Sequence, residues 1–141
     1  GGGSGHDAMI VHGSCHCGAV AYEAEVDPAR AVICHCLDCQ TLSGAAFRAS
    51  VPARVEDFRL LRGAPKTYVK TAESGNRRVQ AFCGDCGSPL YAADAEAAKT
   101  YNLRIGVMAE RAHLPPQREI WCEAALPWTQ GLLALPKIEK Q

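Results

Sequence analysis

The chain has 141 residues, which suffice for one ordinary domain with a continuous core and are too few for two comfortable ones. Its 15 basic and 15 acidic residues balance, and no basic run exceeds two residues, so the sequence lacks the positive surface of a nucleic-acid-binding protein. No stretch approaches the roughly 18 consecutive apolar residues of a membrane-spanning helix, so we expect a cytoplasmic protein that crosses no membrane.

The first eight residues carry no structural signal. Residues 1–8 offer no apolar face and are typical of a flexible linker remnant ahead of Met9. We therefore expect a single domain over residues 9–141, with its motifs within residues 10–128. The sequence leaves the oligomeric state open.

Short alternating segments, separated by Gly, Pro, Asp and Asn about every ten residues, are typical of an antiparallel β domain. In residues 20–26 apolar side chains alternate with mostly polar ones, which predicts a strand with one buried face. Further strands are expected over residues 58–62, 66–71, 77–82, 88–92, 102–107 and 119–121, with a turn at 73–76. The alanine-rich segment 94–99 predicts one short helix with Asp94 as its N-cap.

Eight cysteines form the most informative pattern in the chain. Seven of them fall into three tight groups, whose members are too close to bridge one another easily but suit a shared metal ion. The groups are Cys15-x-Cys17, Cys34-x-Cys36-x-x-Cys39 and Cys83-x-x-Cys86. This spacing favours metal ligation over a disulfide framework.

Two of these groups together supply the four thiolates that a structural zinc ion prefers. Cys15 and Cys17 provide one half of the site and Cys83 and Cys86 provide the other. Gly87 follows the last ligand and gives the backbone freedom to turn around its sulfur. Such a site ties distant parts of the chain together. Combined with the alternating strand pattern, it predicts an all-β fold class, a small zinc-stapled domain.

The remaining group offers three thiolates from six residues, so a tetrahedral ion bound there keeps an open position. A zinc ion held by three thiolates suits a substrate thiol better than water, and it would deprotonate that thiol. The resulting nucleophile can add to a small aldehyde. Cys36 is the candidate catalytic residue, because Cys34 and Cys39 could hold the ion while the middle thiolate detaches. We thus expect two zinc ions per chain, one structural and one catalytic.

The three-cysteine group has a competing interpretation as a second structural site completed by a distant side chain. His12, His113 and Cys122 are the candidates for that fourth ligand. Cys122 has no partner at metal-binding spacing and is expected to be a small buried hydrophobe instead. His16 and His35 sit between ligating cysteines, so an extended backbone would point them away from the sulfurs.

Three stretches of the sequence resemble one known family. They are Gly13-x-Cys15-x-Cys17-Gly18-x-Val20, Cys34-His35-Cys36-x-x-Cys39-Gln40-x-x-Ser43-Gly44-x-x-Phe47 and Phe82-Cys83-x-x-Cys86-Gly87-Ser88-x-Leu90. Their order and spacing resemble the glutathione-dependent formaldehyde-activating enzyme family, which also includes the centromere protein V domain. The resemblance implies an all-β fold of stacked antiparallel hairpins and sheets. It also implies a structural zinc at the four-cysteine set and a second zinc near a thiol substrate at the three-cysteine set. A late Pro127-Trp128 also resembles the end of such domains.

Residues that would bind the rest of a substrate are harder to find from the sequence. The arginines that could meet the carboxylates of glutathione are Arg48, Arg62, Arg77, Arg78 and Arg104, although each is more typical of an ordinary surface or strand arginine. The aromatic residues Phe47, Tyr68, Trp121 and Trp128 are expected to serve the core rather than a pocket.

The leading hypothesis is a zinc-dependent carbon–sulfur lyase-like enzyme that adds a small thiol, with glutathione as a candidate, reversibly to an aldehyde such as formaldehyde. Its expected partners are therefore a small-molecule thiol and an aldehyde. The alternative is a non-catalytic two-zinc structural or protein-interaction module. A dithiol redox protein that uses Cys83 and Cys86 ranks last, because the βαβ context of that motif is missing.

Overall fold

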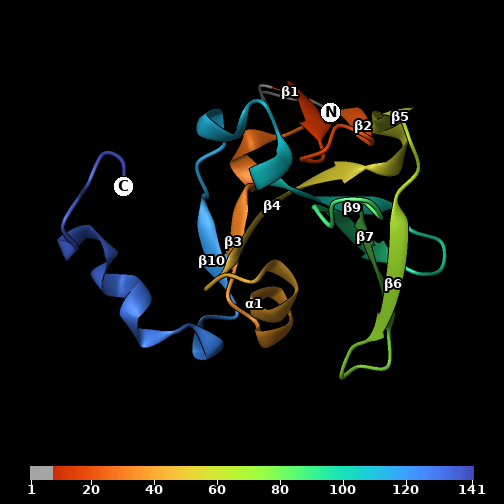
Figure 1. Ribbon diagram of the computed structural model, residues 1–141. Helices are drawn as coiled ribbons and strands as arrows, with labels where there is room; N and C mark the ends of the chain where they lie inside the picture. The colour runs from red at the N-terminus through yellow and green to blue at the C-terminus, as the bar shows by residue number, and fades with distance from the viewer. Residues whose placement is uncertain (1–7) are drawn as a thin grey trace.

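The strands of the protein form two sheets, as seen in a computed structural model that describes residues 8–141 (Figure 1). Residues 1–7, most of the expected linker remnant, lie outside the described residues. The smaller sheet has the order β1-β2-β5 and contains β1 (Met9–Ser14), β2 (Ala21–Val26) and β5 (Phe58–Arg62).

The larger sheet has seven strands in the order β10-β3-β4-β9-β8-β7-β6. They are β3 (Val32–Cys34), β4 (Arg48–Arg54), β6 (Lys66–Thr71), β7 (Arg77–Phe82), β8 (Pro89–Asp94), β9 (Thr100–Arg104) and β10 (Arg118–Ile120). Neighbouring strands run antiparallel except β10, which joins the edge of the sheet parallel to β3. The all-β fold class is confirmed, with this one parallel pair as an addition.

Helical structure is confined to short segments within residues 8–141. The α-helix α1 (Leu37–Ser43) begins inside the three-cysteine group and has Gly44 as its C-cap. The 3-10 turns are η1 (Pro28–Arg30), η2 (Val55–Asp57), η3 (Ile105–Val107), η4 (Arg111–His113), η5 (Cys122–Ala124) and η6 (Pro127–Ala134). None of these helices combines the length and the apolar character needed to cross a lipid bilayer.

The predicted helix over residues 94–99 is wrong. Asp94 ends β8, and the chain turns back into β9 at Thr100, with Ala97 at a positive φ of 53°. Because β8 and β9 pair as neighbours, the connection must be a tight turn, and the helical preference of alanine is too weak to override that pairing. The strand expected over 102–107 likewise stops at Arg104, after which the amide of Met108 bonds to the carbonyl of Ile105 in η3.

The main core lies between the smaller sheet and the β4–β9 part of the larger one. Its buried members are Val11, Tyr22, Ala24, Val26, Ala31, Val51, Ala53, Leu103, Ile105, Met108 and Leu114. An aromatic cluster joins the layers, because the Phe58 ring lies 4.9 Å from the Tyr22 ring and 5.0 Å from that of Tyr101, measured between centroids. Burial of this apolar surface orients the two sheets and hence the hairpin turns that carry the cysteines.

The C-terminal segment leads away from the sheets beyond β10 (Figure 1). It contains η6, in which Trp128 and Leu133 are exposed, and Ile138 beyond η6 is exposed as well. The late Pro-Trp pair thus lies outside the core, where Pro127 begins η6.

Candidate metal centres and adjoining pocket

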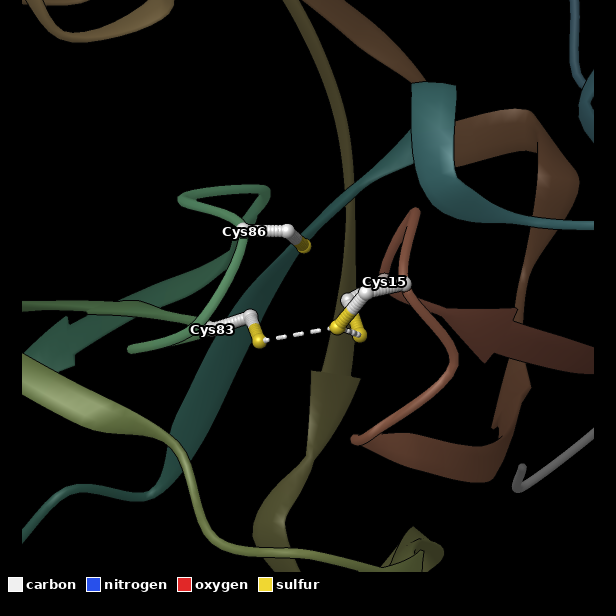
Figure 2. A group of neighbouring side chains, drawn as sticks. Cys15, Cys83 and Cys86 are labelled. Atoms are coloured by element: carbon white, nitrogen blue, oxygen red, sulfur yellow. Dashed lines mark hydrogen bonds between the residues drawn. The ribbon is translucent and has the colours of Figure 1, made fainter.

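Four cysteine sulfurs converge from two hairpins. Cys15 and Cys17 lie in the turn between β1 and β2, and Cys83 and Cys86 lie in the turn between β7 and β8. The four sulfur atoms lie within 4.8 Å of one another. Figure 2 shows Cys83 and Cys86 approaching from one hairpin and Cys15 facing them from the other. The structure therefore brings together two pairs that are far apart in the sequence.

The spacing of these sulfurs fits a tetrahedral metal ion. Cys17 Sγ lies 3.7 Å from Cys15 Sγ and 3.7 Å from Cys83 Sγ. A zinc ion with Zn–S bonds of about 2.3 Å separates tetrahedral sulfur ligands by about 3.8 Å. All eight cysteines are free thiols, so none of this clustering arises from a disulfide.

Each hairpin turn directs backbone amides at its sulfur atoms. The Val20 amide donates to Cys15 Sγ at 3.2 Å, and the Asp85 amide donates to Cys83 Sγ at 3.4 Å. Ser88 joins the two turns, because its hydroxyl accepts from the His16 amide at 3.0 Å and lies 3.3 Å from Cys86 Sγ. The Ser88 side chain and amide lower the pKa of the Cys86 thiol to about 5, so the cluster carries a thiolate at neutral pH.

The second cluster forms where β3 leads into α1. Cys34 ends β3, Cys36 is the N-cap of α1 and Cys39 lies in its first turn. Their three sulfur atoms lie within 4.8 Å of one another. Cys36 Sγ accepts the Cys39 amide at 3.3 Å, which is the bond that an N-cap side chain makes. One short strand-to-helix turn thus gathers the whole set.

A positive charge borders this second cluster. The Arg48 Nη2 group lies 3.4 Å from Cys39 Sγ. A hydrogen bond from Cys34 and the nearby Arg48 charge lower the pKa of Cys39 to about 5, against the opposing effect of burial. The same hydrogen bond raises the pKa of Cys34, since Cys34 holds the shared proton. The cluster therefore has one thiolate ready to bind a soft cation.

Two side chains hold the turn that carries the second cluster. His35 is buried, and its Nε2 lies 2.8 Å from Glu119 Oε1, while its ring packs edge-on against Phe47. The side-chain Nε2 of Gln40 donates to the backbone carbonyls of His35 at 2.9 Å and Ala124 at 3.1 Å. These contacts fix the turn to β10 and to the segment that follows it.

The distant side chains considered as a fourth ligand stay apart from the second cluster. Among residues 8–141, the groups of potential ligands within 4.8 Å are the four-cysteine set and the three-cysteine set alone. The His12 ring bonds instead to Glu110. Cys122 is exposed at the start of η5, so its expected burial is wrong, because the chain leaves the sheet one residue earlier at Trp121. Within the part of the chain that the structure describes, the second cluster therefore has three potential ligands and no fourth.

A pocket of about 410 Å³ adjoins the second cluster. It is lined by Leu42, Arg48, Tyr68, Gln80, Ala81, Phe82, Gly87, Pro89, Tyr91 and Arg104. Arg48 links the two features, because it lines the pocket and also contacts Cys39. Tyr68 lines this pocket and is exposed, so its expected place in the core is wrong. Trp121 and Trp128 are exposed as well and do not serve the core.

The five arginines considered from the sequence now separate into two groups. Arg62 donates to the carbonyl of Gly18, and Arg77 and Arg78 form ion pairs with Glu96 and Asp94. The other two, Arg48 and Arg104, are buried and line the pocket. Nothing in the sequence distinguishes these two groups, because the difference arises from strand pairing and burial.

A protein-family model described as glutathione-dependent formaldehyde-activating enzyme matches residues 10–124, which include both cysteine clusters. The chain belongs to the glutathione-dependent formaldehyde-activating enzyme family. This confirms the family resemblance found in the three cysteine motifs.

Two individual proteins illustrate the range of similarity within and around this family. A protein of Halomonas elongata, which bears the provisional name of a glutathione-dependent formaldehyde-activating enzyme, is 27% identical over 117 residues, which cover 78% of this chain and 73% of its own. The crystal structure of a Rhodobacter sphaeroides protein matches with a TM-score of 0.61 and 25% identity, covering 79% of this chain and 99% of its own.

Proposed function

We propose that this family member is a zinc-dependent carbon–sulfur lyase-like enzyme that adds a small thiol reversibly to an aldehyde such as formaldehyde. Glutathione is the leading candidate for the thiol. The observation that carries the proposal is a cluster of three sulfur atoms without a fourth protein ligand, joined through Arg48 to a pocket of about 410 Å³. Family membership and the name of the Halomonas elongata relative support the same chemistry.

The two clusters would hold zinc in different ways. Cys15, Cys17, Cys83 and Cys86 would complete a tetrahedral structural site. Cys34, Cys36 and Cys39 would hold a second zinc ion, which when bound supplies a Lewis acid that favours the thiolate form of an incoming thiol. A cytoplasmic location, where thiols stay reduced, is consistent with this use of cysteine and stays a prediction.

The reaction balances without an external oxidant or reductant. The substrate sulfur attacks the aldehyde carbon, a carbon–sulfur bond forms and the carbonyl π electrons move to oxygen. The proton released from the thiol ends on that oxygen, which gives an S-hydroxyalkyl product. In the reverse direction the carbon–sulfur bond breaks and the thiol regains its proton. The pocket beside Arg48 would exclude water and orient the thiol substrate.

We assign Cys36 the role of the thiolate that would leave the metal, take the proton of the incoming thiol and return it to the carbonyl oxygen once the carbon–sulfur bond has formed. Arg48 holds Cys39, and Cys34 is fixed by its place at the end of β3. The Cys36 side chain, by contrast, bonds within its own turn at the start of α1, to the Cys39 amide and to the two neighbouring thiols. The two flanking thiolates would keep the metal in place while the middle one moves.

The test compares Cys36→Ser with Cys122→Ser, a matched change at an exposed cysteine outside both clusters. We expect C36S to lose at least 100-fold in glutathione-dependent formaldehyde turnover, in the range of a lost catalytic group, and C122S to keep wild-type turnover. Metal content is measured on the same samples. Unchanged turnover in C36S with two metal ions per chain contradicts the assigned role of Cys36.

A metal-centred measurement separates an enzyme from a non-catalytic zinc module. The protein is loaded with cobalt in place of zinc, and its absorption spectrum is recorded while glutathione is added. We expect one of the two metal environments to respond and the other to stay unchanged. If neither responds, the protein is a structural module and the proposed activity is wrong.

A further inference from the structure

Two buried arginines face the pocket without a carboxylate partner. Arg48 is 7% exposed and Arg104 is 8% exposed. Within residues 8–141 the arginines that pair with carboxylates are Arg54, Arg59, Arg77 and Arg78. Two full positive charges are therefore withdrawn from water with no carboxylate to balance them.

The hydrogen bonds of these arginines leave donors free. Arg104 donates from Nη1 to Ser50 Oγ at 2.7 Å and from Nη2 to Gln80 Oε1 at 3.2 Å, and both acceptors are neutral. Arg48 contacts Cys39 Sγ through Nη2, while its Nε is buried without a partner. A guanidinium has five N–H donors, so both side chains retain capacity toward the pocket.

A buried and unpaired cation is costly, so the fold retains such a group where something offsets the cost. The thiolates of the second cluster supply part of that offset through the contact between Arg48 and Cys39. They leave Arg48 Nε unpartnered, and Arg104 bonds to Ser50 and Gln80 rather than to a sulfur. A ligand that carries negative charge in the pocket accounts for both observations.

We propose that Arg48 and Arg104 form a carboxylate-binding site, so that the enzyme selects small thiols that carry a carboxylate. This inference rests on the proposed function, because the thiol must react at the adjoining cluster. Guanidinium groups match carboxylates through paired N–H donors. Because Arg48 reaches both the pocket and Cys39, one small molecule spans the two sites with its carboxylate and its sulfur.

The remaining walls fit the carbon skeleton of such a molecule. Tyr68, Phe82, Pro89 and Tyr91 supply mostly apolar surface around the arginines. A volume of about 410 Å³ lies within the range of small-molecule sites. The pocket therefore combines two arginines that can bind an anion, Arg48 and Arg104, with mostly apolar walls. This combination orients a ligand by its charged end.

The experiment compares two thiols that differ only in charge, 3-mercaptopropionate and 3-mercaptopropan-1-ol. Their affinities for the zinc-loaded protein are measured by calorimetry, and their contact with metal is followed by absorption of the cobalt-loaded protein. We expect the wild type to bind the carboxylate thiol at least tenfold more tightly. Arg104→Met should bring the two affinities within twofold, while the matched exposed variant Arg77→Met keeps the tenfold preference.

The outcomes separate this inference from the proposed function. Equal affinity for both thiols, with a metal response to each, overturns the carboxylate site and leaves the proposed function standing. Binding of the carboxylate thiol that depends on Arg104, without any metal response, supports the carboxylate site and overturns the proposed function. If neither thiol binds, both the carboxylate site and the proposed function are overturned.

A second pair of variants guards against misfolding of R104M. Arg48→Lys and Arg104→Lys keep the charge but replace the forked guanidinium by a single ammonium group. We expect each to reduce the preference for the carboxylate thiol below fivefold, with thermal unfolding confirming a folded protein. A full tenfold preference in both lysine variants overturns the proposal.

Discussion

Gly87 has a backbone conformation that other residues adopt only with strain. Its φ is +82°, directly after Cys86, and a Cβ at this position would meet no atom within 4 Å. The neighbouring Gly84 lies in the same turn without a positive φ, and a Cβ there would sit 3.5 Å from the Lys66 side chain, an ordinary contact. The two glycines thus separate backbone strain from crowding within one metal-binding turn.

We predict that Gly87→Ala lowers the free energy of unfolding by about 1–2 kcal/mol, the cost of a left-handed conformation for an L-residue. Gly84→Ala should change it by less than about 0.5 kcal/mol, as an unstrained exposed substitution does. Denaturant unfolding of the zinc-loaded proteins measures both. Equal losses in the two variants would show that crowding or helix preference, rather than the φ of Gly87, sets the cost.

Hydrogen bonds to the Glu110 carboxyl group make the stability of the protein depend on the ionisation of this residue. Burial opposes its ionisation, but hydrogen bonds from the His12 amide and ring outweigh burial and lower the pKa of Glu110. A lowered carboxyl pKa stabilises the folded state above the unfolded pKa, and this stabilisation disappears as the pH falls through the folded pKa. The contact joins β1 to the segment after η3.

We predict that Glu110→Gln is less stable than the wild type at pH 7 and that the difference shrinks as the pH falls below about 4.3, the usual pKa of a glutamate. Unfolding of both proteins is followed by denaturant titration from pH 7 to pH 3. The difference in unfolding free energy between the two proteins reports on Glu110 alone, because protonation of the cysteine ligands affects both proteins alike. Glu73→Gln, in an exposed turn, serves as control and should show no such difference.

At the scale of single elements, α1 depends on contacts outside itself. It has seven residues, which is too short to be stable alone, and Gln40 ties it to the carbonyls of His35 and Ala124. The helix therefore holds the three cysteines in place only while the segment after β10 stays docked.

We predict that Gln40→Ala weakens metal binding at the three-cysteine site by about tenfold, since two hydrogen bonds of about 1 kcal/mol each are lost with partial compensation by water. Binding at the four-cysteine site should not change, because Gln40 makes no contact there. Cobalt titration resolves the two sites by their spectra, and Gln130→Ala in the exposed η6 is the control. A uniform loss at both sites would mean that Gln40 supports the whole fold instead.

The sequence predicted some elements well for identifiable physical reasons. The strands at 58–62, 66–71 and 77–82 have the observed bounds, because turn residues flank each of them. The strand β3 has three residues, too few to show a period. The strand β4 is hard to predict because it contains Pro52, and proline usually argues against a strand that pairs on both sides, as β4 does. The helix α1 has a cysteine as its N-cap, which is not a usual helix start signal.

The candidate site likewise has one part that the sequence predicts, the cysteine groups, and one part that it does not, the pocket. The cysteine groups could be predicted because metal ligands from one turn leave a fixed local spacing, as in Cys34 to Cys39. The pocket could not, because Leu42, Tyr68 and Arg104 come from α1, β6 and β9 and meet only through long-range pairing. Burial separates the pocket arginines from the surface ones, and burial is a property of the whole fold.

At the scale of the whole molecule, the two cysteine clusters constrain very different lengths of chain. Cys17 and Cys83 are 66 residues apart and belong to hairpins of different sheets. The three-cysteine cluster lies within six consecutive residues. Cross-linking removes conformational entropy from the unfolded chain in proportion to the logarithm of the enclosed loop. A metal at the four-cysteine site should therefore stabilise the fold more than one at the three-cysteine site.

We predict that Cys17→Ser/Cys86→Ser lowers the free energy of unfolding by about 2 kcal/mol more than Cys34→Ser/Cys36→Ser, the loop-entropy difference between a long and a short closure. The first pair is exposed and the second is half-buried, so neither leaves a large cavity. Denaturant unfolding with one equivalent of zinc per remaining site measures the difference. Equal losses, or a larger loss in the second variant, would place the main structural constraint at the three-cysteine cluster and argue against an open site there.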